Sequence, residues 1–220
     1  MLAFHNGGIK LETEVTFLLL LAPACCWCAG LGLFKTLLAL GLLHRYAPNG
    51  ALPGSLSYLG SAAVFWPVAL LAFTETVIDM IPGGDVRWNR WNGKIRVLGG
   101  SALGWMATAH TGLFNAAFMA LLGAFLALIS HGFKSGARIA AAEAGTNKFV
   151  SPVTGVTETC MIFAILLPLS GTPALTGMML MFTLLGGCLV MYLVWPCVRQ
   201  AWTEVFFLSL PEPPKNSPGT

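Results

Sequence analysis

Residues 113–138 read LFNAAFMALLGAFLALISHGFKSGAR, and this stretch decides what kind of protein the chain is. It is mostly apolar, and its first Lys, Arg, Asp or Glu is Lys134. A run of about 20 mainly apolar residues is long enough to cross the hydrocarbon core of a bilayer. His131, Lys134 and Arg138 are spaced so that a single helix face holds all three. The stretch therefore predicts a membrane helix with ionisable side chains on one face.

The whole chain has the same character. Of its 220 residues, 56% are apolar and only 10% are charged, and its mean hydropathy is +0.75. Soluble domains are about 25% charged, so the composition excludes a nucleic-acid-binding domain, a disordered chain and a disulfide-stapled secreted module. We predict one all-α transmembrane domain over residues 1–210, followed by a flexible proline-rich tail at 211–220.

Apolar segments predict about six membrane spans. They lie at approximately 15–43, 56–81, 97–110, 113–142, 153–169 and 173–198. Pro23, Gly30 and Gly32 predict a kink or a break in the first span. Segments 97–110 and 153–169 are short, and they are either tilted helices or half-helices buried inside the protein. The expected architecture is a polytopic helical bundle with short or discontinuous helices.

The distribution of Lys and Arg favours six spans over five. With six crossings, one side of the membrane holds Lys10, Arg87, Arg90, Lys94, Arg96, Lys148, Arg199 and Lys215. The other side holds Arg45 alone. A five-span arrangement divides these charges almost evenly. Because cytoplasmic loops are enriched in basic residues, both termini are expected in the cytoplasm.

The polar segment between the second and third spans interleaves aromatic and basic residues. Its members are Arg87, Trp88, Arg90, Trp91, Lys94 and Arg96. RNA contact is one interpretation of such a pattern. Beside a membrane span, the pattern favours a lipid interface, with indole rings at headgroup depth and cations on anionic lipids. We therefore expect membrane lipids as partners and no nucleic acid.

Ionisable residues inside the predicted spans are the main functional signal. Each costs about 2.5–3.5 kcal/mol at the centre of a membrane helix, so these residues are expected to pair with one another. The set is Lys35, Glu75, Asp79, Lys134, Arg138 and Glu158. Glu75 and Asp79 share one helix face, and Ser151, Thr154 and Glu158 share another.

Two interpretations of this set remain open. In the first, Lys35, Glu75, Asp79, His131, Lys134, Arg138, Ser151, Thr154 and Glu158 line a transport path for a proton, an ion or a small anion. In the second, the charges are structural ion pairs, with Asp79 and Arg138 close enough to a helix end to reach water. His131 is either a proton carrier or an interior histidine.

Two short sequences occur twice in the chain. Phe34-Lys35-Thr36 recurs as Phe133-Lys134-Ser135, and Thr74-Glu75-Thr76 recurs as Thr157-Glu158-Thr159. With six spans, the two copies of each lie three crossings apart and run in opposite directions. This arrangement predicts an inverted 3+3 repeat, a plan that many secondary transporters use.

The cysteines do not predict a metal site. Cys25, Cys26 and Cys28 look like a ligand cluster, but the spacing is neither that of zinc nor that of haem, and no histidine is near. Thiols in apolar segments more often pack as small hydrophobic groups. We expect no metal and no cofactor.

The chain resembles a known family over about residues 28–170. The motifs are Leu33-Phe34-Lys35, the stretch from Phe73-Thr74-Glu75 to Ile81-Pro82-Gly83-Gly84-Asp85, the helix from His131 to Arg138, and Ser151-Pro152-Val153-Thr154-Gly155-Val156-Thr157-Glu158. They resemble the bacterial membrane proteins grouped as domain of unknown function 4126. The chain departs from that pattern at Asp79-Met80 and at Ser151. The resemblance implies the architecture and the choice of residues only, and it implies no reaction. We expect the protein in the bacterial inner membrane.

A proton- or cation-coupled secondary transporter, or a carrier of a small anionic or lipid solute, is the leading functional hypothesis. Glu75 and Glu158 would carry the proton or cation, each pairing with Lys35 or Lys134 in one access state. Ser151, Thr154 and a helix start after Pro152 would donate hydrogen bonds to an anionic group.

Two other functions remain open. The first is an accessory subunit of a larger membrane complex, with other subunits or a second copy of the chain as partner. The second is an enzyme, which is the less favoured because the sequence has no nucleophile elbow, zinc-protease motif or cofactor fingerprint. A lipid-modifying activity would use His131 and Glu158.

Overall fold

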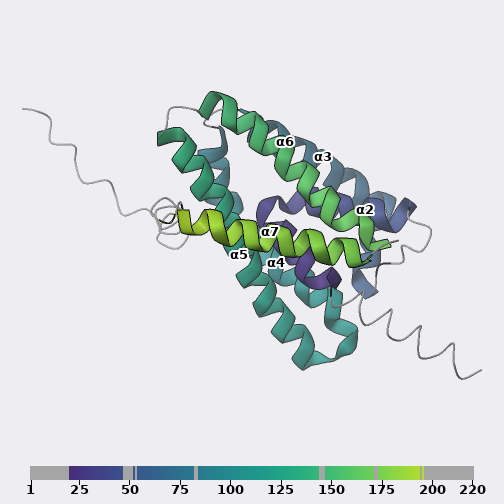
Figure 1. The fold of residues 1–220 in the computed structure, drawn as a ribbon. Coiled ribbons are helices and arrows are strands. Elements are labelled where there is room, and N and C mark those ends of the chain that lie inside the picture. The colour runs from purple at the N-terminus through teal and green to yellow at the C-terminus, as the bar shows by residue number, and fades with distance from the viewer. Residues whose placement is uncertain are drawn as a thin grey trace, which may run out of the picture.

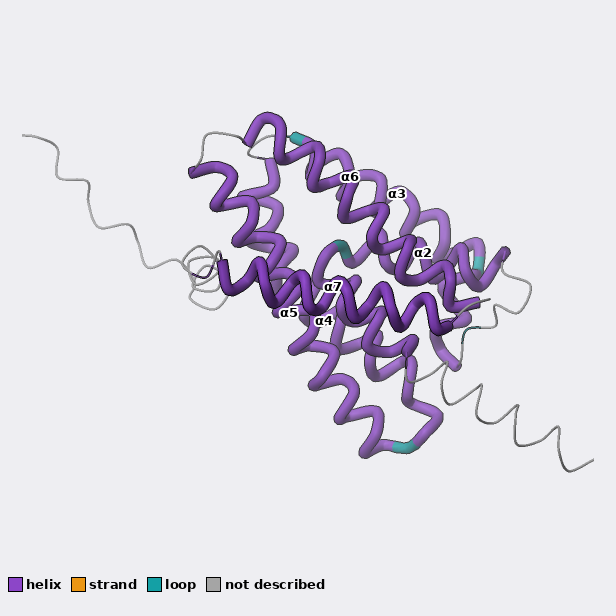
Figure 2. Tube along the Cα trace, viewed as in Figure 1, coloured by secondary structure: helices purple, strands orange, loops and turns teal. Residues whose placement is uncertain are grey.

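The computed structural model describes residues 20–46, 52, 54–81, 84–143, 147–170, 173–193 and 195. These residues form helices joined by short turns, and no strand occurs among them (Figures 1 and 2). The all-helical prediction is therefore confirmed. The predicted tail at 211–220, the predicted span ends at 15–19 and 196–198, and Lys10, Arg199 and Lys215 lie outside the described residues.

The elements follow one another closely along the chain. They are the helix Leu20–Leu31, α2 (Leu33–Tyr46), the 3-10 helix η1 (Gly54–Gly60), α3 (Ala62–Met80), α4 (Gly84–Thr108), the 3-10 helix η2 (Ala109–Thr111), α5 (Leu113–Glu143), α6 (Asn147–Leu166), the 3-10 helix η3 (Leu167–Ser170) and α7 (Pro173–Leu193).

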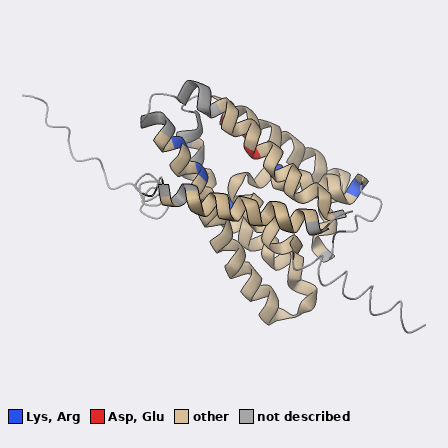
Figure 3. Ribbon diagram, in the orientation of Figure 1, with Lys and Arg blue, Asp and Glu red and all other residues tan. Residues whose placement is uncertain are grey.

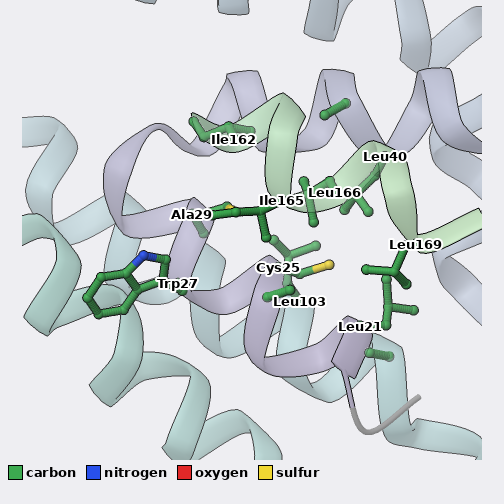
Figure 4. Close-up of a cluster of buried hydrophobic side chains, with 14 of the residues drawn as sticks. Leu21, Cys25, Trp27, Ala29, Leu40, Leu103, Ile162, Ile165, Leu166 and Leu169 are labelled. Carbon is green, nitrogen blue, oxygen red and sulfur yellow. The ribbon is translucent and has the colours of Figure 1, made fainter. Parts of the chain in front are cut away.

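The helix Leu20–Leu31 lies at the centre of the bundle. Its side chains are buried on almost every side, and even the large Trp27 is only 1% exposed. Figure 4 shows Cys25 in the middle of an apolar cluster to which Leu103 of α4 and Ile165 of α6 also belong, with Trp27 at its edge. A helix that is apolar all round is typical of a protein core, so this helix holds the other elements together.

The first apolar segment contains a break, as predicted, and of the three candidate residues it is Gly32 that interrupts the helix. The helix Leu20–Leu31 ends immediately before this residue, and α2 begins immediately after it. Glycine is a poor helix former, and it also leaves room here. A Cβ atom on Gly32 would lie 3.1 Å from Cδ of Lys35 and 3.4 Å from Oε2 of Glu75. The interruption therefore lies directly beside two charged side chains.

Helix α4 differs from the prediction. Residues 82–93 were expected to form a loop before a short span at 97–110, but a single helix runs from Gly84 to Thr108. The first half of α4 is polar and the second half is apolar. A prediction from hydropathy therefore assigns the first half to a loop and only the second half to a span, although both belong to one helix. Lys and Arg are good helix formers, and the same helix face stays buried from Asn92 through Arg96 to Leu103.

Helices α4 and α5 pack closely as an antiparallel pair. The turn between them passes through Gly112, whose φ of +113° favours glycine. A Cβ atom on Gly100 would lie 2.8 Å from the carbonyl oxygen of Gly123, and one on Gly104 would collide with that of Met119. Small residues one turn apart permit such a close approach of membrane helices.

Helix α6 also begins earlier than predicted. The expected start lay after Pro152, but α6 begins at Asn147 and contains this proline. A proline near the amino end of a helix removes few backbone hydrogen bonds, so the helix continues through it. The amide groups that follow Pro152 are therefore not the free donors of a helix start.

The outer surface is apolar. Large exposed side chains cover α3, α5 and α7, and they include Trp66, Leu70, Phe73, Phe114, Phe118, Leu121, Phe182, Leu185 and Leu189. Among the described residues, three helices are long and apolar enough to cross a membrane: Ala62–Met80, Leu113–Ala140 and Pro152–Leu169. Leu20–Leu31 and Leu175–Leu189 are shorter apolar helices. Figure 3 shows how few positions carry a charge. This is the surface of a membrane protein.

Candidate functional site

A network of buried polar side chains lies where α2, α3, α4, α5 and α6 meet. We call it the charge network, and its members are Lys35, Glu75, Asp79, Asn92, Arg96, His131, Lys134, Arg138 and Glu158. None of them is more than 8% exposed. The molecule therefore holds a network of charged side chains in its interior, beneath an apolar exterior.

Asp79 of α3 lies at the centre of the charge network. Its Oδ2 atom accepts hydrogen bonds from Nζ of Lys35 at 2.8 Å and from Nζ of Lys134 at 3.0 Å. Its Oδ1 atom lies 3.3 Å from Nη1 of Arg138. The side chain is completely buried. The predicted access of Asp79 and Arg138 to water is therefore wrong, because both side chains turn into the bundle.

Glu158 of α6 shares its cationic partners with Asp79. Its Oε2 atom lies 2.6 Å from Nζ of Lys134, and its Oε1 atom lies 3.3 Å from Nη2 of Arg138. Lys134 and Arg138 are one turn apart on α5, so each bridges two carboxylates from two different helices. This part of the network joins α3, α5 and α6.

Glu75 has a different set of neighbours. Its Oε1 atom accepts hydrogen bonds from Nη2 of Arg96 at 2.7 Å and from Nδ2 of Asn92 at 3.2 Å. The expected pairing of Glu75 with Lys35 or Lys134 is not the one observed, because both lysines bond to Asp79. Sequence reasoning also placed Arg96 at the lipid interface, and this was wrong. Its side chain is fully buried against Glu75.

His131 of α5 lies behind Arg96. Its Nδ1 atom is 3.4 Å from Nη1 of Arg96, and its Nε2 atom is 3.4 Å from Oγ of Ser135. A guanidinium group only donates hydrogen bonds, so Nδ1 is the acceptor and the imidazole is neutral. A Cβ atom on Gly93 would lie 2.7 Å from Nε2 of His131, so glycine makes room for the ring.

The interrupted first segment contributes backbone carbonyl groups to the network. Lys134 Nζ donates to the carbonyl oxygen of Leu31 at 2.9 Å. Ser130, one turn earlier on α5, donates to the carbonyl oxygen of Trp27 at 2.8 Å. Helix α5 therefore holds the central helix through side chain to backbone hydrogen bonds, and one of them ends next to Gly32.

The described members of the network do not balance in charge. Lys35, Arg96, Lys134 and Arg138 are cationic, against the three carboxylates of Glu75, Asp79 and Glu158. The six ionisable residues found in the predicted spans have three positive and three negative charges, which sum to zero. Arg96 adds a fourth positive charge to the network. With a neutral His131, the described network has an excess of one positive charge.

The predicted interface segment divides between two faces of α4. Trp91 is 77% exposed and Lys94 is exposed as well, whereas Trp88 is half-buried and Arg96 is inside. The side chains of Arg87 and Arg90 lie outside the described residues. Because α4 is a helix here, residues one turn apart share a face, and the described members lie partly on an exposed face and partly on a buried one.

The remaining predicted site residues are not among the members of the charge network. Thr154 is half-buried on α6, one turn before Glu158, and the side chain of Ser151 lies outside the described residues. Cys25, Cys26 and Cys28 are buried thiols, and Cys26 donates a hydrogen bond to the carbonyl oxygen of Gly100. No group of His, Cys, Asp and Glu in the described part of the chain is arranged to hold a metal ion.

Asn92 and Arg96 are the network residues that sequence reasoning did not assign to an interior site. A signal for them exists in the sequence. Continuing the buried face of the apolar half of α4 backwards, from Leu103 through Gly100, leads to positions 96 and 92. Helical periodicity, rather than average hydropathy, would have found both.

Comparison with curated proteins and with solved structures found no match. Residues 19–195 match the model of the family described as a domain of unknown function, DUF4126. The match includes the interrupted first segment, all five helices of the charge network and α7. It confirms the resemblance found in the sequence motifs. The chain belongs to the DUF4126 family.

Proposed function

We propose that the protein is a secondary transporter or carrier that moves a small anionic or lipid solute across the bacterial inner membrane, coupled to a proton or cation. The observation that carries the proposal is the charge network inside an apolar exterior. Ionisable residues within membrane proteins typically mark substrate paths, ion paths and proton relays. Here they come from five helices and surround an interrupted helix, as in many secondary transporters.

The charge balance favours an anionic solute. An uncompensated charge in a low-dielectric interior is costly, and the described network has one cation more than it has carboxylates. A solute with a carboxylate, a phosphate or another anionic group would balance this excess. Lys35, Lys134 and Arg138 present the charged donors for such a group.

Exchange of partners at Lys134 supplies a coupling step. Its Nζ atom bonds to Asp79 and to the carbonyl of Leu31, and it lies 2.6 Å from Glu158. Protonation of Glu158 would remove one negative partner of Lys134. The lysine would then bind an anionic solute in place of that carboxylate, so proton and solute would enter together.

Six crossings are part of the proposal. The interrupted first segment and helices α3, α4, α5, α6 and α7 supply them. At 1.5 Å per residue, the 25 residues of α4 extend about 37 Å, which exceeds a bilayer core of about 30 Å. With Arg96 in the interior, the basic residues that remain outside still favour cytoplasmic termini.

An inverted repeat fits the positions of the two lysines. Lys35 and Lys134 belong to the repeated Phe-Lys-Thr/Ser sequence, and both donate to the same oxygen of Asp79. The two glutamates of the other repeated sequence have different partners, Arg96 for Glu75 and Lys134 for Glu158. In the two proposed halves, the lysines would therefore occupy equivalent positions, whereas the glutamates would bind different cations.

The test is flux through the purified full-length chain in proteoliposomes. An imposed pH gradient is followed with a pH-sensitive dye, with chloride, phosphate or a short carboxylate as the added anion. We expect wild type to dissipate the gradient and the double variant Glu75→Gln, Glu158→Gln to lose this activity. Thr157→Val, on the exposed face of α6 beside Glu158, is the matched control.

Two results would contradict the proposal. Unchanged flux in the double variant would remove both glutamates from the mechanism. An inactive wild type that purifies from native membranes in a stoichiometric complex would favour the accessory-subunit function, with the charge network serving only to fix helix packing.

A further inference from the structure

Polar atoms without a hydrogen-bond partner line one face of α4. In the described part of the chain, Nε1 of Trp88, Oδ1 of Asn92 and Nε of Arg96 are buried and have no protein partner. These residues are spaced four apart, so they lie on one side of the helix. Oε2 of Glu75, on α3, is a fourth such atom. Buried polar groups are almost always satisfied by protein or by ordered water, so these four atoms indicate a ligand of matching chemistry.

Three of the four atoms, those of Asn92, Arg96 and Glu75, belong to the interface between α3 and α4, and Trp88 lies one turn before Asn92 on α4. The hydrogen bonds from Asn92 and Arg96 to Oε1 of Glu75 hold the two helices together. Helix α4 begins at Gly84, so Trp88 lies nearer to the start of this helix than Asn92 does. Trp88 is half-buried, whereas Asn92 is 2% exposed and Arg96 is fully buried. The row therefore leads from a partly open end of α4 into the interior.

The chemistry of the four atoms matches water. The indole N–H and the guanidinium Nε–H are donors, and the amide oxygen and the carboxylate oxygen are acceptors. A metal cation would be repelled by Arg96, and an anion would be repelled by Glu75. A water molecule both donates and accepts, and buried waters typically make about three hydrogen bonds to such groups.

Glu75 differs from the other two carboxylates of the network. Both oxygens of Asp79 and both oxygens of Glu158 lie within 3.3 Å of a Lys or Arg nitrogen. Oε2 of Glu75 has no such partner, and it faces the helix interruption at Gly32. Among the carboxylate oxygens of the described network, Oε2 of Glu75 is the one without a Lys or Arg nitrogen beside it, so it is the oxygen that can accept a proton.

We propose that the α3–α4 interface holds a file of water molecules that delivers the coupling proton to Oε2 of Glu75, the glutamate that accepts it before Glu158. This inference rests on the proposed transport function. In the step, an O–H bond of a hydronium ion breaks as the Oε2–H bond forms, and a neutral water remains in the file. Trp88 and Asn92 are positioning residues for the water. The neutral acid no longer balances Arg96, which keeps its hydrogen bond to His131.

The charged and titratable groups around Glu75 come from α2, α3, α4 and α5. Arg96 is its ion-pair partner on α4, and Asp79 lies one turn along α3. Lys35 of α2 lies beside the same glycine that Oε2 faces, and His131 of α5 lies behind Arg96. Helix α6 contributes the apolar Ile162 at this point. Loss of the negative charge on Glu75 would therefore release Arg96 first.

Infrared difference spectroscopy tests the proton site without requiring transport. On acidification of the reconstituted full chain, we expect the carbonyl band of a protonated carboxylic acid to appear. The band should shift in heavy water, be absent in Glu75→Gln and persist in Glu158→Gln. A band that survives in Glu75→Gln, or that disappears only in Glu158→Gln, would overturn the assignment.

Proton uptake into proteoliposomes tests the water file. We expect Glu75→Gln to abolish uptake and both Trp88→Phe and Asn92→Leu to slow it several-fold, because each removes a water partner while keeping most of the side-chain volume. Trp91→Phe is the matched control on the exposed face of the same helix, and it should not change uptake. Equal rates in Trp88→Phe, Asn92→Leu and Trp91→Phe would exclude the file.

The two experiments separate the inference from the proposed function. If Glu75 shows the acid band but wild type moves no protons, the proton site stands and transport fails. If uptake is lost in Glu158→Gln and normal in Glu75→Gln, transport stands and the proposed path to Glu75 fails.

Discussion

Glu75 and Asp79 lie one turn apart on the same face of α3, and both are completely buried, yet their surroundings differ. Asp79 binds cations from α2 and α5 through both of its oxygens. Glu75 binds α4 through one oxygen and leaves the other without a partner. The comparison indicates that Asp79 holds the bundle together, whereas Glu75 can change its protonation state without separating several helices.

Asp79→Asn should have the largest effect on stability. It leaves Lys35, Lys134 and Arg138 facing a neutral side chain, and removing one partner of a buried ion pair typically costs about 3–5 kcal/mol. We expect a marked fall in the midpoint of thermal unfolding in detergent. A fall no larger than that of Glu75→Gln would show that the two carboxylates are equivalent.

Glu75→Gln should destabilise the protein less. The amide can still accept the hydrogen bonds of Arg96 and Asn92, and only one cation, Arg96, loses its carboxylate partner, so the cost should lie at the lower end of about 3–5 kcal/mol. The same variant should lose proton uptake. If stability falls as far as in Asp79→Asn while uptake persists, the roles assigned to the two carboxylates are reversed.

Lys35→Met should cost less again. The variant removes one cation from Asp79, but Lys134 and Arg138 remain, so no buried charge is left alone and the cost should be about 1 kcal/mol. Lys134→Met is the matched comparison, since it removes contacts to Asp79, to Glu158 and to the carbonyl of Leu31. The midpoint of thermal unfolding should fall further in Lys134→Met than in Lys35→Met. Equal midpoints would contradict the assignment of more partners to Lys134 than to Lys35.

Gly32→Ala should have the smallest effect on stability. The added methyl group lies 3.1 Å from the flexible Lys35 side chain and 3.4 Å from Oε2 of Glu75, and Gly32 does not have a positive φ that alanine would avoid. We expect a nearly unchanged unfolding midpoint and slower proton uptake. Gly155→Ala is the control on the other carboxylate, because its methyl group would lie 3.5 Å from Cβ of Asp79. Equal uptake in both variants would argue against Oε2 as the proton acceptor.

Much of the charge network could be predicted from the sequence. Lys35, Glu75, Asp79, Lys134 and Glu158 stand out because an ionisable residue within an apolar segment is costly unless it is paired. Helical spacing also placed Glu75 and Asp79 on one face. What spacing along the chain does not contain is the partner of each residue, and in this structure Glu75 pairs with Arg96 and not with a lysine.

The largest error concerned α4, and its cause is physical. Average hydropathy divides residues 84–108 into a polar loop and an apolar span, but backbone hydrogen bonding continues through both. Arg96 belongs to a polar sequence and to a buried helix face at the same time. A buried residue within a polar sequence, such as Arg96, is recognised only when the helical periodicity of the apolar half of α4 is continued into its polar half.

The sequence by itself determined the helical class, the apolar exterior, the break at Gly32, most of the buried charges and the family. These depend on composition and local spacing, which are properties of the chain alone. Only the tertiary structure decided which cation each carboxylate binds and which carboxylate oxygen stays open. Those outcomes depend on how helices distant in sequence pack, and a hydrogen bond requires its two atoms to meet within about 3 Å.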